Sequence, residues 1–282
     1  MSQEILIPPT RMIRARLFEA LRANGIETAL AECIEAKHYP LYMPQVVDAR
    51  IGAAKDSPLF QNWWTTPSVR VTGKSRGGHN VVAYAHVPNY FSDPLNIKTA
   101  REAGLRNGAG IMPVPDFYAL LEREDNKTVF VVDYDTLCNA ESDVISVSAA
   151  LKHPQTIPFL GGRERAEQYL AKHAEVYGKN IGIWYSDDLE ENPRGRFLFL
   201  GYGSGGLGGY VDLNNCGRFV GVVAAEPRER YLVREAHARG GESPYRVPAA
   251  VVGPRLEDLI AIVNNPDLNR QGMIEQITDK YR

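Results

Sequence analysis

Gly73-Lys74-Ser75 has the residue types that end a phosphate-binding P-loop. That loop requires a glycine at the position where this chain has Ser68, and a helix after the lysine whose amides converge on the phosphates. Gly77-Gly78 and an alternating apolar run follow instead. We therefore predict a hairpin turn here rather than a nucleotide site.

A second nucleotide motif, G-x-G-x-x-G, is formed by Gly201, Gly203 and Gly206 after an apolar run. Glu226 lies about 20 residues further on, where dinucleotide sites carry the acid that binds the ribose. A helix N-terminus that would hold the pyrophosphate is not expected, because residues 207–217 are rich in glycine, β-branched residues and Asn/Asp, which form helices poorly. We interpret the spacing as accidental; a nucleotide-binding enzyme that uses the Gly201–Gly206 turn stays open as an alternative.

Acidic residues offer two further chemistries. Asp133 and Asp135 follow an apolar run like the Asp pair of phosphoaspartate hydrolases, but the threonine of that pattern comes one residue early, at Thr136. A solvent-facing turn is the better interpretation, with a hydrolytic enzyme using Asp133 and Asp135 as the alternative. Acids at positions 187–191 have the oxygen ligands that calcium prefers, although adjacent acids on a loop are usually solvated. The histidines lack metal-ligand spacing, so we predict no catalytic residues, no metal and no cofactor.

Composition excludes several classes of protein. The 282 residues are 44% hydrophobic, which supplies a sizeable core, and the formal net charge of −2 gives no reason to expect nucleic acid or an anionic membrane as partner. Cys33, Cys138 and Cys216 are far apart and odd in number, which indicates a reducing compartment. No run approaches the roughly 20 apolar residues of a membrane helix, and the first residues do not resemble a signal peptide. We expect a cytoplasmic protein.

The pattern of apolar residues predicts an α+β fold with short antiparallel strands. Helical spacing is found over Thr10–Leu21, Glu27–Ala36, Val46–Lys55, Ile97–Ala103, Pro115–Glu124 and Gly162–Tyr177, and again over Arg255–Val263 and Leu268–Tyr281. Strands are expected as a hairpin between Val69 and Val87 and over Thr128–Val132, Ile181–Tyr185, Arg196–Leu200 and Phe219–Ala224. The predicted organisation is an N-terminal helical segment over 1–60, an α+β domain over 61–226 and a C-terminal helical extension over 227–282.

Between the last two strands lies the window Tyr202–Cys216, which reads YGSGGLGGYVDLNNC. Tyrosines supply a large contact area with little rotamer entropy to lose, and Ser, Asp and Asn supply adaptable hydrogen bonds, as in antibody paratopes. Leu207, Val211 and Leu213 are apolar residues spaced along the window, and we expect them to fix it to the core. We predict a recognition surface rather than a mobile loop.

The late strands and this window resemble the C-type-lectin-fold variable proteins of diversity-generating retroelements. The similarity is carried by Ile181-Gly182-Ile183-Trp184, by Arg196–Gly201 and by Gly217–Val222, and it covers 126–225. In that family, error-prone reverse transcription randomises adenines, mostly in Asn-type codons. Such codons never yield Lys, Glu, Gln, Met or Trp, and the window contains none of these five residue types.

The resemblance implies a C-type-lectin-like fold and a non-enzymatic protein that binds a protein or another macromolecule. It does not imply a metal, because the calcium-ligand motifs of sugar-binding C-type lectins are not evident. A phage-associated or structural subunit is the third interpretation, after the enzyme. The implied variable positions are Tyr202, Ser204, Gly205, Gly206, Gly208, Gly209, Tyr210, Asp212, Asn214, Asn215 and Cys216.

Overall fold

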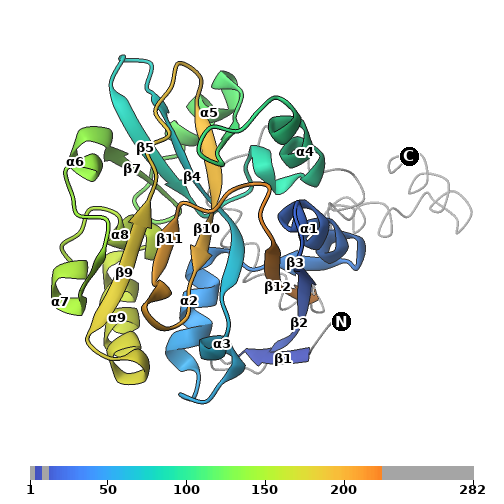
Figure 1. Ribbon diagram of the computed structural model, residues 1–282, viewed down its shortest axis with the longest axis vertical. Coiled ribbons are helices and arrows are strands. Elements are labelled where there is room, and N and C mark those ends of the chain that lie inside the picture. Colours follow the sequence, from blue (N-terminus) through green and yellow to red (C-terminus); the bar gives the residue numbers. More distant parts are fainter. Residues whose placement is uncertain (1–3, 8–12, 224–282) are drawn as a thin grey trace, which may run out of the picture. The chain divides into compact units, whose positions relative to one another are not determined.

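Strands with two-residue alternation build the larger of two sheets in the computed structural model, which describes residues 4–7 and 13–223. The sheet is eight-stranded, and its order is β7-β5-β4-β10-β11-β9-β8, with β6 pairing with β10 (Figure 1). Neighbouring strands are antiparallel except β11 and β9, which are parallel. Its strands are β4 (Trp64–Lys74), β5 (Asn80–Ala85), β6 (Gly110–Ile111), β7 (Val129–Asp133), β8 (Val144–Ser146), β9 (Asn180–Tyr185), β10 (Arg194–Leu200) and β11 (Leu207–Gly209).

The smaller sheet joins the two ends of the described chain. It has the order β1-β2-β12-β3, and its strands are β1 (Glu4–Ile7), β2 (Ile13–Ala20), β12 (Gly217–Val223) and β3 (His38–Pro40). Strand β12 lies between β2 and β3 and is antiparallel to both, with Phe219 opposite Phe18 and Val222 opposite Tyr39. All described residues belong to one compact unit.

The prediction of a helix over Thr10–Leu21 is wrong, because residues 13–20 form β2. Ala15 and Leu17 are buried on one face of this strand, and Arg16 on the other face is half-buried. Phe18 is also buried, and this extra apolar residue mimics helical spacing. The partner strand β12 comes from the other end of the described chain, so no local signal reveals the pairing.

The five other long helices predicted on described residues are found close to their predicted positions, and the structure adds shorter helices that were not predicted. The helices are α1 (Gly25–Glu35), α2 (Met43–Gly52), α3 (Pro58–Gln61), α4 (Pro94–Glu102), α5 (Val114–Leu121), α6 (Tyr134–Cys138), α7 (Val147–Ala150), α8 (Thr156–Leu160) and α9 (Arg163–Tyr177), with short 3₁₀ turns η1 (Tyr90–Ser92) and η2 (Gly203–Gly205). The predicted helices at 255–263 and 268–281 lie outside the described residues. No helix in the described part is both long and apolar enough to cross a membrane.

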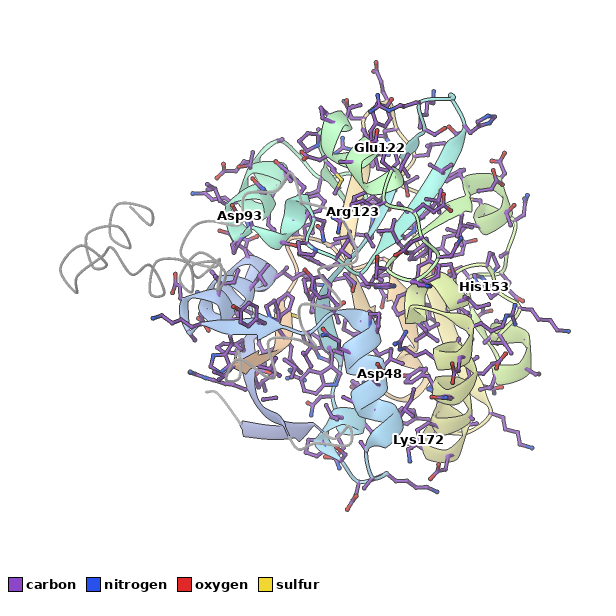
Figure 2. All side chains as sticks on the ribbon, turned by 180° about the vertical axis from the view of Figure 1, so that it is seen from behind. Asp48, Asp93, Glu122, Arg123, His153 and Lys172 are labelled. Atoms are coloured by element: carbon purple, nitrogen blue, oxygen red, sulfur yellow. The ribbon has the colours of Figure 1, made fainter. Side chains whose placement is uncertain are left out.

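Helix α9 shows how burial selects one helical face. Ala166, Tyr169, Leu170 and His173 are buried at helical spacing, and Gly178, with φ of 100°, ends the helix. The helix packs against α2, where Arg165 donates to Asp48 at 2.7 Å. Asp48 on α2 and Lys172 on α9 mark this helical side of the molecule in the view from behind (Figure 2).

His86 is a buried titratable group at the end of β5. Its Nε2 donates to the carbonyl of Pro158 at 2.8 Å, and its Nδ1 lies 3.0 Å from Ser68 Oγ, which also accepts from the Met43 amide. Burial lowers the pKa of His86 from 6.5 to about 4. The folded protein therefore holds this ring neutral over most of the acidic range.

We expect the free energy of unfolding to fall as the pH is lowered from 6.5 towards 4. In that window the unfolded chain takes up a proton at His86 that the folded chain excludes, so the contribution lost is up to about 3 kcal/mol. Urea unfolding at several pH values should show a smaller acid loss in His86→Gln than in the unmodified protein. Replacement of the exposed His79 by glutamine should leave the loss of stability at low pH unchanged. An equal loss in the His86 and His79 variants would show that His86 is not the group that causes it.

Candidate functional site

The predicted window forms the connection between the two sheets. After β10 the chain makes the η2 turn, returns as β11 and then crosses to β12 (Figure 1). Strand β11 pairs with β10 on one side and with β9 on the other, with Gly208 opposite both Phe199 and Trp184. Residues 207–209 of the window are therefore part of a sheet rather than a mobile loop, and this strand was not predicted from the sequence.

Three apolar side chains hold the window from beneath, as predicted. Leu207 and Leu213 are fully buried, and Val211 has only 6% of its surface exposed. The backbone adds further bonds: the Leu213 amide donates to the Gly108 carbonyl at 2.9 Å, and the Ile26 amide at the start of α1 donates to the carbonyl of Asn215 at 3.1 Å. The window is thus fixed to the core at several points along its length.

Buried arginines lie under the window. Arg70 and Arg196 share the carboxylate of Asp188, and all three side chains are fully buried. The Arg70–Asp188 distance is 2.6 Å, and Arg196 Nε lies 2.9 Å from the same carboxylate. Arg196 also donates to the carbonyl of Tyr210 and, at 2.7 Å, to that of Asn107. One charged cluster therefore positions the backbone of an exposed tyrosine.

A third buried arginine fixes the beginning of the window. Arg50 on α2 donates to the carbonyl of Gly201 at 2.7 Å and to the hydroxyl of Tyr169 on α9 at 3.0 Å. Its other nitrogens bond the carbonyls of Leu59 and Asn62. A planar guanidinium with several donors can join these separate elements at once, which explains an arginine at this buried position.

The predicted variable positions divide into exposed and buried groups. Those with exposed side chains are Tyr202, Tyr210, Asn214 and Asn215, and those that are half-buried are Gly205, Asp212 and Cys216. The buried positions are Gly206, Gly208 and Gly209. Ser204 lies in η2, between Gly203 and Gly205. Gly208 and Gly209 are buried because they belong to β11, which lies between β10 and β9 and has no exposed edge.

Gly206 and Gly208 have no room for a side chain. At Gly206 the φ angle is +54°, and a Cβ would overlap the carbonyl oxygen of Gly182 on β9. At Gly208 a Cβ would lie 2.9 Å from the Phe199 ring. At Gly209 the nearest atoms, from Arg70, Gln155 and Trp184, would be 3.3 Å away. The geometry therefore favours glycine at the first two positions, and whether any of the three varies stays a prediction.

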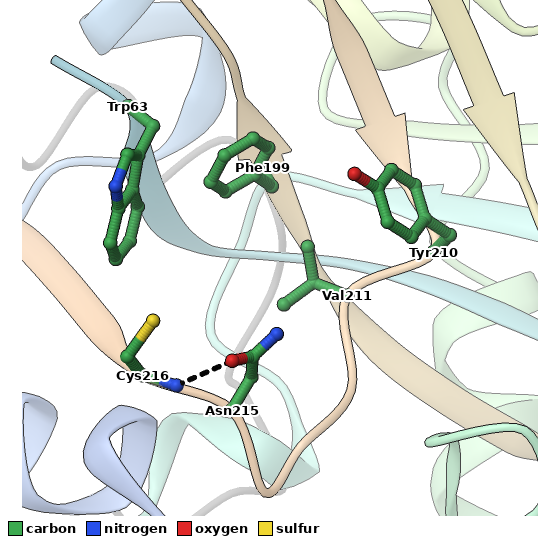
Figure 3. A pocket seen from close by; sticks show the side chains of 6 residues that line it. All are labelled: Trp63, Phe199, Tyr210, Val211, Asn215 and Cys216. Atoms are coloured by element: carbon green, nitrogen blue, oxygen red, sulfur yellow. Dashed lines mark hydrogen bonds between the residues drawn. The ribbon is translucent and has the colours of Figure 1, made fainter. Parts of the chain in front are cut away.

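Two depressions flank the exposed tyrosine of the window. One, of about 210 Å³, is lined by Trp63, Phe199, Tyr210, Val211, Asn215 and Cys216 (Figure 3). The other, of about 400 Å³, is lined by Trp184, Tyr185, Ser186 and Tyr210. The window therefore contributes side chains to a surface that it shares with residues of β9, β10 and the residue before β4.

These neighbouring aromatic residues were missed by the sequence analysis. Trp63 lies far from the window in sequence, and only the fold places it beside Cys216 (Figure 3). Trp184 and Tyr185 lie at the end of β9, where a strand leaves the sheet interior and both side chains become half-buried. Trp63 and Trp184 lie at strand ends and could have been considered as surface residues. The sequence pattern alone does not say which tryptophans face solvent.

The other candidate sites have structural roles. Gly73-Lys74-Ser75 lies in the β4–β5 hairpin, as predicted, where the Ser75 amide donates to the His79 carbonyl at 2.9 Å. Gly201, Gly203 and Gly206 are followed by strand β11, so they do not open a helix. Asp133 caps α6 by accepting from the Thr136 amide at 2.8 Å, a bond that lowers the pKa of its carboxyl, and Asp135 is exposed.

Three of the four acids in the 187–191 loop are bound by other side chains, and the fourth, Glu191, is exposed. Asp188 is held by two arginines, Asp187 accepts from the Tyr134 hydroxyl, and Glu190 pairs with Arg194 and, at 3.0 Å, with Arg106. Among the residues that the structure describes, no group of three or more His, Cys, Asp or Glu side chains is arranged to hold a metal ion. These three loop acids thus act in ion pairs and hydrogen bonds.

Comparison with known proteins gives one informative similarity. No protein-family model and no curated protein sequence matches the chain. A solved structure described as "Accommodation of massive sequence variation in Nanoarchaeota by the C-type lectin fold" is 50% identical to this chain, with a TM-score of 0.70. The match covers 74% of this chain and 98% of that chain.

Proposed function

Because this chain belongs to the C-type-lectin-fold variable proteins, we propose that it is a non-enzymatic binding protein whose recognition surface is built from residues 202–216. The chain has the C-type lectin fold, with the mixed α+β composition that the sequence predicted. Diversification by a retroelement would change the exposed side chains, while the buried ones keep the backbone in place. Affinity would come from tyrosines as anchors and polar residues as an adjustable rim.

The observation that carries the proposal is the separation of side chains within the window. Leu207, Val211 and Leu213 are buried, whereas Tyr202, Tyr210, Asn214 and Asn215 are exposed. Their backbone is bonded to the larger sheet through β11 and to the start of α1. Substitution at an exposed site away from buried features usually changes stability little. Such a surface tolerates the sequence changes that a diversified ligand site requires.

The enzyme alternative has less support. Asp133 is an exposed helix cap, and the Gly201–Gly206 turn precedes a strand instead of a helix. A catalytic carboxylate would be expected in a concave site with a perturbed pKa. We therefore favour binding over hydrolysis or nucleotide chemistry.

Sequencing of the gene and its surroundings tests the origin of the surface. We expect a nearly identical template repeat for the segment that encodes 202–216, next to a reverse transcriptase gene. The two copies should differ at adenines of the template, and mostly in codons of the exposed positions. A locus with neither a repeat nor a reverse transcriptase would exclude diversification by a retroelement in this protein.

Adjacent residues in the window should respond differently to substitution. Asn214→Ser should change the free energy of unfolding by less than about 0.5 kcal/mol, because the side chain is exposed. Leu213→Val should cost about 1 kcal/mol, because it removes a methylene from a fully buried site. Urea titration of both purified variants checks this; equal losses would mean that the window is not divided into outer and inner side chains.

A further inference from the structure

Trp63 is held in place by residues outside the window. Its ring lies 5.3 Å from the Phe199 ring of β10, with 33° between the planes, and the guanidinium of Arg218 lies 4.7 Å from its centroid. Arg218 is in turn held by Glu19 on β2 and, at 2.7 Å, by Asn62. Because none of these partners belongs to 202–216, the orientation of the half-buried indole does not depend on the residues in the window.

The depression beside Trp63 is lined partly by residues outside the window and partly by residues of the window. Trp63, Phe199 and the buried Val211 form an apolar wall and floor, and Tyr210, Asn215 and Cys216 of the window form the other side (Figure 3). Among the residues that the structure describes, no charged side chain lines it. A ligand that enters therefore meets the same apolar surface whatever the three window residues are.

The size of this depression indicates what fits. Its volume of about 210 Å³ is below the roughly 300–1,000 Å³ typical of small-molecule sites. Protein interfaces commonly bury one large apolar side chain in a pocket near their centre, surrounded by polar contacts that exclude water. An apolar pocket next to exposed tyrosine and asparagine side chains matches that arrangement.

We propose that Trp63 and Phe199 form a constant anchor site, which accepts one apolar side chain of a protein partner and contributes to affinity for every partner that the window selects. This inference rests on the proposed function and names the class of ligand. The window would then determine which partner binds. The anchor site would add a similar contribution to affinity in every variant of the window.

Library selection with the full chain tests the proposal. Positions 202, 210, 214, 215 and 216 are randomised, and the displayed library is selected against a defined protein, hen lysozyme. Trp63→Ala is then introduced into several independent lysozyme binders, and dissociation constants are measured. We expect affinity to fall about tenfold or more in most of them, and Trp63→Phe to cause a smaller loss.

Tyr118→Ala is the matched control. Tyr118 is also half-buried and lies under an arginine, Arg76, at 4.5 Å, but it belongs to α5 and does not line the depression. It should change the dissociation constants less than about twofold. If Trp63→Ala fails to fold, Trp63→Phe tests the anchor site instead. It should weaken affinity for lysozyme about threefold, whereas Tyr118→Phe should not weaken it.

The outcomes separate this inference from the proposed function. Binders that keep their affinity without the indole would overturn the anchor site and leave the recognition surface intact. A library that yields no binders would count against the recognition surface itself. Binders that prefer a neutral sugar or a small molecule to any protein would overturn the assignment of the partner class.

Discussion

Replacement of Gly206 by alanine should lower the free energy of unfolding by about 4 kcal/mol. Gly206 has φ of 54° and ψ of −134°, a backbone conformation that glycine adopts readily but that costs a residue with a Cβ roughly 1–3 kcal/mol. The new methyl group would also overlap the carbonyl of Gly182 and lie 2.7 Å from its nitrogen. Since both contacts are to backbone atoms of β9, no side-chain rotation can relieve them, and overpacking adds roughly 1–3 kcal/mol or more.

Gly205 provides the control for this prediction. It is the adjacent residue, its φ is not positive, and a Cβ there would meet no atom within 4 Å. Gly205→Ala should therefore unfold at nearly the same urea concentration as the unmodified protein. Similar midpoints for the two variants would show that Gly206 does not limit the sequence of the window. The expected difference predicts that natural variants change at 205 far more often than at 206.

A second large loss is expected for Asp188→Asn, about 3–5 kcal/mol. The substitution keeps the shape of the side chain but removes the charge that Arg70 and Arg196 share, which leaves two guanidiniums fully buried without their common counter-ion. The desolvation cost of buried charges is offset only when they remain paired. Thermal or urea unfolding measures the loss directly.

Glu191→Gln is the matched control for the charge. Glu191 is an exposed acid of the same loop, so its neutralisation should alter the free energy of unfolding by less than about 0.5 kcal/mol. Because Arg196 donates to the Tyr210 carbonyl, Asp188→Asn should also weaken ligand binding in clones that use Tyr210. A loss below about 1 kcal/mol for Asp188→Asn would mean that the arginines find other partners.

Local pattern predicted the elements that carry their own signal. The helix over residues 163–177 has buried residues at helical spacing and a terminal glycine, and the β4–β5 hairpin has alternating residues around a glycine-containing turn. Both signals lie within one element or between neighbours. Their formation requires no information from elsewhere in the chain.

Elements that depend on distant partners were not predictable in the same way. The local pattern of β2 predicts a helix, and its partner β12 lies too far away in sequence to correct this. Strand β11 is not predicted, because Leu207-Gly208-Gly209 has low strand propensity. That segment is a strand because β9 and β10 bond it on both sides. Tertiary pairing outweighs local preference at both places.

The burial pattern within the proposed site was predictable from the sequence, but the residues that surround the window were not. Leu207, Val211 and Leu213 are buried as the sequence indicated, and the exposed tyrosines and asparagines were among the residues named. The neighbouring Trp63, Trp184 and Tyr185 come from other strands, so a search limited to the window could not find them. Gly206 and Gly208 were predicted as variable positions, but close packing favours glycine at both. The sequence alone does not distinguish a glycine that packing requires from one in a flexible surface segment.

Pairing of Phe18 with Phe219 has a consequence for protein synthesis. The N-terminal strand leaves the ribosome long before β12, so its sheet stays incomplete until translation has passed through the whole window. A product with a stop codon or a shifted frame in the window never receives β12 and keeps unpaired strand edges, which invite aggregation and proteolysis. If the window is diversified as we propose, each variant would be subject to this quality check, because only chains translated through the window complete the smaller sheet.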